Sequence, residues 1–396
     1  MIERKYPVNY WISMHMVPCL EALEPFFVCI ESDDFVGAGR VIDSCDTDEL
    51  HKALMRSLLY QSVGDVNAAL KVLEPFIDAE DFYVNRNLLR LYLSLSMTDE
   101  ASKALKSLKP ANEEMQTIVL NAEGSLMWRS GRNELAKERF EQAFELAKRC
   151  NNSMLLSSCI INRALMLQCF GNATEAEKLY MEAMNIAKSS GMVENVLISR
   201  LDLGELYKET GKTDRAKEII LSAIEYGDGY KNYNVSSIMR DCYINLGDIF
   251  FMEKDLDQAE KFYEKAIDQK YGETADVARA YMGKTRILME RKELSEALNL
   301  LEAAHALAKR AGSPRYEAET LLLRGQVYER QNRLNDALQS YGVAVFLFRK
   351  LGNTYEIARG EKAVGEIYRR MGDEDRAAEH MKKAEDMSAS MTRTRD

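Results

Sequence analysis

The sequence predicts an all-α protein, a right-handed superhelical solenoid of stacked antiparallel helical hairpins. Three periodic observations predict it. An alanine recurs every 38 to 43 residues, a second alanine follows each one after seven residues, and a glycine or polar residue precedes each by five. A fixed period in this range is typical of arrays in which one helical hairpin stacks on the next. The alanine pairs are Ala136/Ala143, Ala176/Ala183, Ala216/Ala223, Ala259/Ala266, Ala297/Ala304, Ala337/Ala344 and Ala377/Ala384.

The first helix of each predicted hairpin carries a small residue, and a large residue follows it three positions later. In the clearest copy these are Gly204 and Tyr207, which share a helix face because residues three or four apart lie on the same side. A small side chain lets two helix backbones approach, and large neighbours fill the volume beside it. The small positions are Gly124, Ala164, Gly204, Gly247, Thr285, Gly325 and Gly365.

A turn and a second helix complete each hairpin. Gly211 permits the backbone to leave the first helix, and Asp214 lies where the second helix would begin. Ala216, Ile220 and Ala223 then share one face of that helix. The predicted turn positions are Gly131, Gly171, Gly211, Lys254, Lys292, Asn332 and Gly372.

This order of small, aromatic, turn and paired-alanine positions resembles the tetratricopeptide-repeat (TPR) superfamily, in a long-helix variety with a period near 40 residues. The resemblance covers roughly residues 115–386. HEAT-type hairpins have similar periods and are the second interpretation. The alanine pair with a turn residue five positions earlier argues against them.

The pattern divides the chain into three expected regions. Residues 1–110 should form an irregular helical block with degenerate repeats, residues 111–386 seven TPR-like hairpins, and residues 387–396 a disordered tail. No Gly-, Ser- or Pro-rich linker separates the first two regions, so the block should stack directly on the array.

The composition excludes several classes of protein. A net charge of −10 and a pI near 5.3 argue against binding to nucleic acid or to an anionic membrane, which need a basic surface. No run of 18 apolar residues suggests a transmembrane helix, and the start does not read as a signal peptide. Seven cysteines without a Cys-x-x-Cys pair predict a reducing compartment, with the cytoplasm as the expected location.

Catalytic and metal-binding signatures are missing from the sequence. Its four histidines are scattered, without zinc-ligand spacing, and it has neither a phosphate-binding loop nor a Gly-x-Ser-x-Gly elbow. We therefore expect no enzyme activity, no cofactor and no metal.

The first helices supply the candidate binding site, because they line the inner wall of such arrays. Two residues before the small position, three consecutive copies carry Asn162, Asp202 and Asn245. An amide side chain offers a donor and an acceptor, as a peptide unit does. The resemblance implies that Asn at this position can hydrogen-bond an extended peptide. A purely structural polar row is the alternative interpretation.

Further along the wall, Phe251 begins an apolar patch, and Arg279 and Arg286 begin a basic one. Arginines there would suit an acidic peptide segment, unless nearby glutamates neutralise them. The predicted peptide-binding groove comprises Asn162, Asp202, Asn245, Phe251, Arg279 and Arg286.

The predicted function is a non-enzymatic scaffold or adaptor that binds an extended peptide segment of a protein partner in this groove. One alternative is a peptide-responsive signalling regulator whose array changes pitch when its ligand binds. A second is an obligate subunit of a larger complex, which would form a homodimer or dock through its C-terminal hairpin.

Overall fold

The computed structural model describes residues 24–32, 34–95, 97–129, 132–230, 233–269 and 275–393. These residues form helices, turns and loops, with no β-strand among them. None of the helices they form is long and apolar enough to cross a membrane. Contacts divide the chain into two units, with the boundary inside one helix between Asn245 and Leu246. Among the described residues, the first unit also includes Gln269, and α15 and the helices after it belong to the second unit.

The N-terminal part of the first unit consists of short helices, four of which begin at a capping aspartate. The carboxylates of Asp34, Asp48, Asp65 and Asp81 each accept a hydrogen bond from the backbone N–H three residues later. These four carboxylates therefore satisfy backbone N–H groups at the starts of the helices. The elements are α2 (Glu24–Glu31), α3 (Phe35–Ser44), α4 (Glu49–Ser62), α5 (Val66–Leu73), the 3₁₀ helix η2 (Glu74–Ala79), α6 (Phe82–Ser94) and α7 (Thr98–Lys106).

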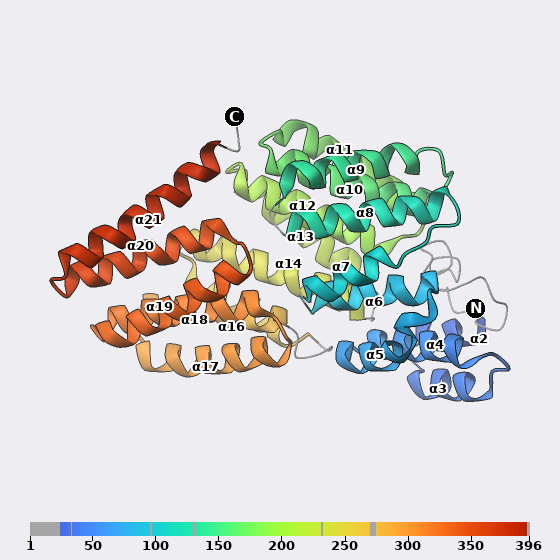
Figure 1. Ribbon diagram of the computed structural model, residues 1–396, viewed down its shortest axis with the longest axis horizontal. Helices are drawn as coiled ribbons and strands as arrows, with labels where there is room; N and C mark the ends of the chain where they lie inside the picture. Colours follow the sequence, from blue (N-terminus) through green and yellow to red (C-terminus); the bar gives the residue numbers. More distant parts are fainter. Residues whose placement is uncertain are drawn as a thin grey trace. The chain divides into compact units, whose positions relative to one another are not determined.

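Longer helices follow, and consecutive helices pack as antiparallel pairs (Figure 1). This arrangement confirms the predicted all-α repeat fold. The pairs are α8 (Glu113–Arg129) with α9 (Asn133–Ala147), α10 (Ser153–Cys169) with α11 (Ala173–Ser189), α12 (Val193–Glu209) with α13 (Thr213–Gly227), α14 (Tyr233–Met252) with α15 (Leu256–Ile267), α16 (Ala275–Glu290) with α17 (Leu294–Arg310), α18 (Pro314–Arg330) with α19 (Leu334–Lys350), and α20 (Thr354–Arg370) with α21 (Glu374–Arg393).

The turn inside each described hairpin uses a left-handed residue at the predicted position. In the α12–α13 hairpin, Gly211 has φ 73°, and the amide of Lys212 donates back to the carbonyl of Tyr207 at 2.8 Å. This bond closes the end of the first helix. The left-handed turn residues are Gly171, Gly211, Lys254, Lys292, Asn332 and Gly372. Gly131, the remaining predicted position, lies outside the described residues.

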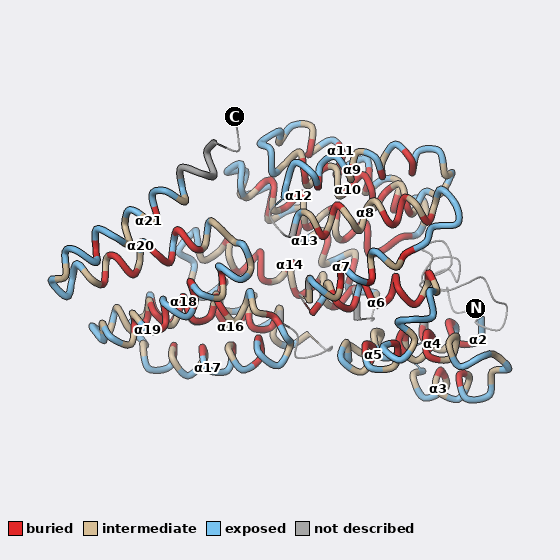
Figure 2. Tube along the Cα trace, viewed as in Figure 1, coloured by how far each residue is buried: buried red, intermediate tan, exposed pale blue. Residues whose placement is uncertain are grey.

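The paired alanines form the centre of each hairpin, where the two helices face each other. Both alanines are buried in all seven hairpins, and Figure 2 shows buried segments where paired helices meet. The large residue between them packs against the small position of the first helix. At Gly204, for example, a Cβ atom would lie 2.5 Å from Cγ1 of Ile220. The small residues are therefore required by the close approach of the helices.

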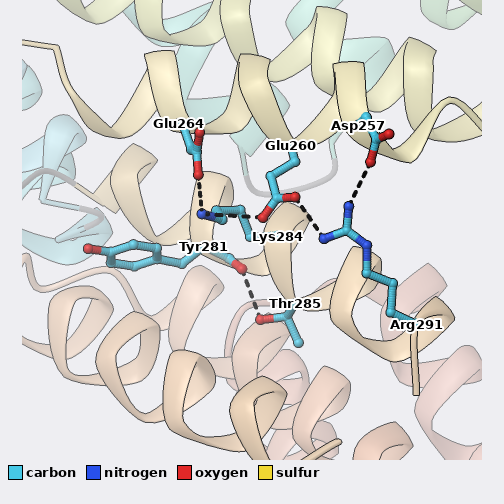
Figure 3. Close-up of polar contacts among 7 residues, drawn as sticks. All are labelled: Asp257, Glu260, Glu264, Tyr281, Lys284, Thr285 and Arg291. Carbon is cyan, nitrogen blue, oxygen red and sulfur yellow. Dashed lines mark hydrogen bonds and ion pairs between the residues drawn. The ribbon is translucent and has the colours of Figure 1, made fainter. Parts of the chain in front are cut away.

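Charged side chains join α15 to the next hairpin in the second unit (Figure 3). Lys284 on α16 lies 2.8 Å from Glu264, and Arg291 lies 2.7 Å from Glu260 and 2.9 Å from Asp257. Pairs this exposed contribute about 0–1 kcal/mol each. The network therefore fixes the register between hairpins more than it stabilises the fold.

The last helix extends beyond the predicted end of the array. α21 continues to Arg393, whereas we expected a disordered tail from residue 387. No glycine or proline interrupts the helix after Ala384, and the Ser388 hydroxyl donates to the Ala384 carbonyl at 2.9 Å. The boundary expected at residue 110 stays a prediction.

Candidate functional site

Neighbouring first helices of the first unit are joined by polar side chains about one repeat apart. From α8 to α10, Asn162 Nδ2 donates to Asn121 Oδ1 at 2.9 Å. From α10 to α12, Gln168 Nε2 donates to Glu209 Oε2 at 2.8 Å. From α12 to α14, Asn245 Nδ2 donates to Glu205 Oε1 at 3.1 Å. We name these residues, with the charged groups beside them, the first-helix seam: Asn121, Asn162, Gln168, Asp202, Glu205, Lys208, Glu209, Asp241 and Asn245.

The Asn121–Asn162 pair keeps hydrogen-bonding capacity. Both side chains are partly exposed, and their mutual bond uses one proton of Asn162 and the oxygen of Asn121. The oxygen of Asn162 and the amide nitrogen of Asn121 have no other hydrogen bond to a described residue. An asparagine amide has two donor protons and one acceptor oxygen. The pair therefore presents an acceptor and a donor next to each other.

Asp202 is the acidic group of the seam without a compensating partner. Its partly buried carboxylate makes no hydrogen bond or ion pair with any residue in the described ranges. Burial, followed by the negative charges of Glu205 and Asp241, raises its pKa well above the usual range. Lys208, the cation of the seam, donates to Asn245. A positive group placed here would stabilise the ionised carboxylate.

Asn245 differs from the exposed residue that we expected, because it is fully buried. Its Nδ2 donates to Glu205 and to the backbone oxygen of Asp241, and its Oδ1 accepts from Lys208 Nζ at 2.5 Å. The long side chains of Glu205 and Lys208 reach it from α12 and close over it. Asn245 would have to release these bonds before it could contact a peptide.

The position two residues before the small residue does not face outward throughout the array. At Gly283, a Cβ atom would lie 2.4 Å from the Tyr263 ring on the preceding second helix. Leu323, at the same position, is buried. At these two residues the position faces the packed interior, whereas it is partly exposed at Asn162 and Asp202.

The remaining predicted residues belong to the second unit. Arg286 Nη2 lies 3.2 Å from Asp248, and its guanidinium lies 5.9 Å from the centre of the Phe251 ring. Lys254 approaches the same ring at 5.6 Å. Phe251 and Arg286 thus lie together at the end of α14. Arg279 lies on α16.

Two arginines on a later first helix, Arg359 and Arg370 on α20, are also paired. Arg359 lies 3.2 Å from Glu356, and Arg370 lies 3.0 Å from Glu329. The glutamates thus neutralise much of the positive charge, as in the alternative interpretation of this region.

Four residues of the seam were not predicted from the sequence: Asn121, Gln168, Glu205 and Lys208. Each bonds to a residue 37 to 41 positions later, so a search for polar pairs one repeat apart would have found them. In the described part of the chain, no group of three or more His, Cys, Asp or Glu side chains could hold a metal ion. Burial raises the pKa of the Cys159 thiol to about 12, which keeps that thiol protonated at neutral pH.

Comparisons with known proteins agree with this architecture. Residues 151–311 match the model of the MalT-like TPR region, and residues 363–390 match a tetratricopeptide repeat. No curated protein matches the sequence significantly. These matches and the fold define a helical repeat protein of the solenoid class. Over these residues the chain carries repeats of the tetratricopeptide type.

Several solved structures have a similar fold. A Rap protein complexed with Competence and Sporulation Factor is 11% identical with a TM-score of 0.60, over 94% of this chain and 98% of that one. The apo quorum sensor NprR from B. thuringiensis is 15% identical with a TM-score of 0.57, over 93% and 97%. The Rap conjugation gene regulator of plasmid pLS20, in complex with the Phr* peptide, is 15% identical with a TM-score of 0.55, over 83% and 96%. At these identities the likeness shows the fold alone.

Proposed function

We propose that this protein is a non-enzymatic, cytoplasmic adaptor that binds an extended peptide segment of a partner along the first-helix seam. The observation that carries the proposal is the Asn121–Asn162 amide pair, followed on the next first helix by the unpartnered carboxylate of Asp202. The similar fold of a regulator solved with its Phr* peptide supports a peptide as the ligand.

The chemistry of the seam suggests which peptide it would bind. The free oxygen of Asn162 and the free amide nitrogen of Asn121 match the N–H and C=O of an extended backbone. These contacts would not depend on the peptide's sequence. Asp202, surrounded by Glu205 and Asp241, would select a lysine or arginine of the peptide, because a positive charge offsets the repulsion among the three carboxylates.

Asn245 has a supporting role in this proposal. Its amide holds Lys208 and Glu205 in place, so its loss would disturb the seam indirectly. Phe251, Arg279 and Arg286 would form a further contact surface on the second unit.

Affinity capture from native lysate, followed by peptide mapping, tests the proposal. Wild type would be compared with an Asn162→Ala/Asp202→Asn variant and with a control, Gln339→Ala, which changes an exposed residue of α19. For each partner lost only in the seam variant, overlapping peptides that cover its sequence would be synthesised. Each peptide would be titrated into the three proteins by calorimetry. We expect one basic peptide to bind the wild type and the control but not the seam variant. Equal binding to all three proteins would refute the proposal.

A peptide-responsive regulator is the second candidate function. It is favoured because the fold extends over 93% of this chain in the comparison with the quorum sensor NprR. Hydrogen exchange with and without the mapped peptide separates the two functions. A regulator should show changes in hairpins remote from the seam, whereas an adaptor should show protection at the seam only.

The third candidate is an obligate subunit that docks through the last hairpin. Tyr355 on α20 is 63% exposed, and Met371, in the turn before α21, is 45% exposed. Sedimentation velocity of the wild type and a Tyr355→Ser variant would detect self-association through this hairpin.

A further inference from the structure

A hollow of about 440 Å³ lies on the surface of the first unit beside α8 and α9. Leu120 and Leu146 supply its apolar wall, and the other lining residues are polar or charged. None of its residues belongs to the first-helix seam. The six lining residues are Leu120, Gln142, Glu145, Leu146, Lys148 and Arg149.

The repeat shows how another hairpin fills the same place. Counted from the small position and the first alanine, Leu120, Gln142 and Leu146 correspond to Arg200, Ser222 and Tyr226 of the α12–α13 hairpin. There the guanidinium of Arg200 donates to the backbone oxygen of Ser222 at 2.5 Å and lies 4.8 Å from the centre of the Tyr226 ring. A long cationic side chain and an aromatic ring thus occupy the volume that two leucines leave open in the α8–α9 hairpin.

The neighbouring second helix explains why the hollow remains open. In two other hairpins the position equivalent to Leu120 is also aliphatic, as Ile160 and Leu321. Both of these side chains are buried, whereas Leu120 is partly exposed. The second helices that precede them, α9 and α17, have 15 and 17 residues. The helix that precedes α8 is α7, which has nine residues. We infer that α7 ends too early to cover Leu120.

We propose that this hollow binds an aromatic side chain with a carboxylate close to it, as in a C-terminal phenylalanine or tyrosine of a partner. An aromatic ring would cover Leu120 and Leu146, as the Arg200 and Tyr226 side chains fill the equivalent place.

The two cations at the hollow are held only by exposed ion pairs. Two cations, Lys148 and Arg149, line it with one carboxylate, Glu145. Lys148 pairs with Glu145 at 3.1 Å, and Arg149 pairs with Glu113 at 3.3 Å. All four side chains are about half exposed or more, so these ion pairs are weak and can be exchanged for a ligand carboxylate at little cost.

Methyl NMR of the full chain with N-acetyl-L-tyrosine as the probe tests this site. We expect saturable shifts of the Leu120 and Leu146 methyl groups, and several-fold weaker binding of N-acetyl-L-tyrosinamide, which lacks the carboxylate. Absence of shifts up to the solubility limit would overturn the proposal, as would equal binding of acid and amide.

A variant in which larger side chains fill the hollow tests whether the probe binds there. Leu120→Arg/Leu146→Tyr copies the Arg200–Tyr226 arrangement and should abolish the probe shifts at Ala143 and Ala147, which pack in one cluster with Leu120. Leu221→Arg, an exposed change on α13, should bind like the wild type. Should the double variant fail to fold, Gln142→Trp closes the rim from an exposed position. Shifts that persist in a folded, filled variant contradict the site.

This inference does not depend on the proposed function of the seam. The Asn162→Ala/Asp202→Asn variant should bind N-acetyl-L-tyrosine as the wild type does. Loss of the probe from that variant would place its binding at the seam and overturn the assignment to the hollow.

Discussion

The hydroxyl of Tyr263 donates to the carboxylate of Asp248 at 2.7 Å, while its ring is held between two glycines. A Cβ atom would lie 2.6 Å from the ring at Gly247 on α14, and 2.4 Å from it at Gly283 on α16. The ring is fully buried, and burial followed by the charge of Asp248 raises the pKa of the phenol. One tyrosine thus joins three helices of two successive hairpins.

Gly283→Ala should therefore destabilise the protein, because the added methyl group would overlap the Tyr263 ring. Overpacking of this kind costs about 1–3 kcal/mol. Gly204→Leu should have an effect of the same sign, since it would collide with Ile220. Urea unfolding followed by circular dichroism measures the shift of the midpoint.

Gly342→Ala is the control for these substitutions. Gly342 lies inside α19, and a Cβ atom there would meet nothing within 4 Å. Alanine should stabilise this helix by about 0.5–1 kcal/mol. A midpoint that Gly283→Ala left unchanged, or raised as Gly342→Ala should, would disprove the close packing around Tyr263.

The fold could be predicted from the sequence because its determinants are short-range steric requirements repeated along one chain. Ala216 and Ala223 are buried where two helices touch, and Gly211 occupies a left-handed turn. Lys254 and Lys292 take the same left-handed conformation, which lysine does not favour. These two turns could be predicted only from their place in the repeat.

The candidate site could be predicted only in part, because exposure depends on neighbouring helices. Asn162 and Asn245 share a repeat position, yet Asn162 is partly exposed and Asn245 is buried. The difference arises from Glu205 and Lys208, which reach across from α12. We attribute the hollow beside Leu120 to the short helix α7. The hollow could not be predicted, because the degenerate repeats upstream of residue 110 do not indicate how long that helix is.

Asp202→Asn should stabilise the protein at neutral pH. Burial and the charges of Glu205 and Asp241 raise the pKa of Asp202 in the folded state above its unfolded value. Between the two pKa values the folded state binds more protons, so this carboxyl group costs stability as the pH rises. The substitution removes that cost, and its benefit should shrink toward zero as the pH falls to the unfolded pKa.

Unfolding midpoints of the wild type and Asp202→Asn, measured from pH 7 down to pH 4, check this expectation. Asp214→Asn, on the exposed side of α13, is the control and should show little pH-dependent difference. A benefit of Asp202→Asn that grew toward acid would mean that the carboxylate has a stabilising partner.

Glu361 should determine how firmly the last helix is attached. Its side chain is 3% exposed, lies 2.6 Å from Nδ1 of His380 on α21, and accepts a hydrogen bond from Arg349 on α19. The His380 ring also stacks on Tyr368, with 5.5 Å between ring centres. Glu361→Gln keeps the shape but removes the negative charge that both partners contact. Hydrogen bonds to charged groups contribute about 1.5–3 kcal/mol, so the free energy of local opening of α21 should fall by a similar amount.

Native-state hydrogen exchange of the α21 amides measures this fall, with Glu385→Gln on the exposed face of α21 as the control. Equal protection of α21 in the two variants would show that helix packing alone, without this buried carboxylate, holds α21 in place.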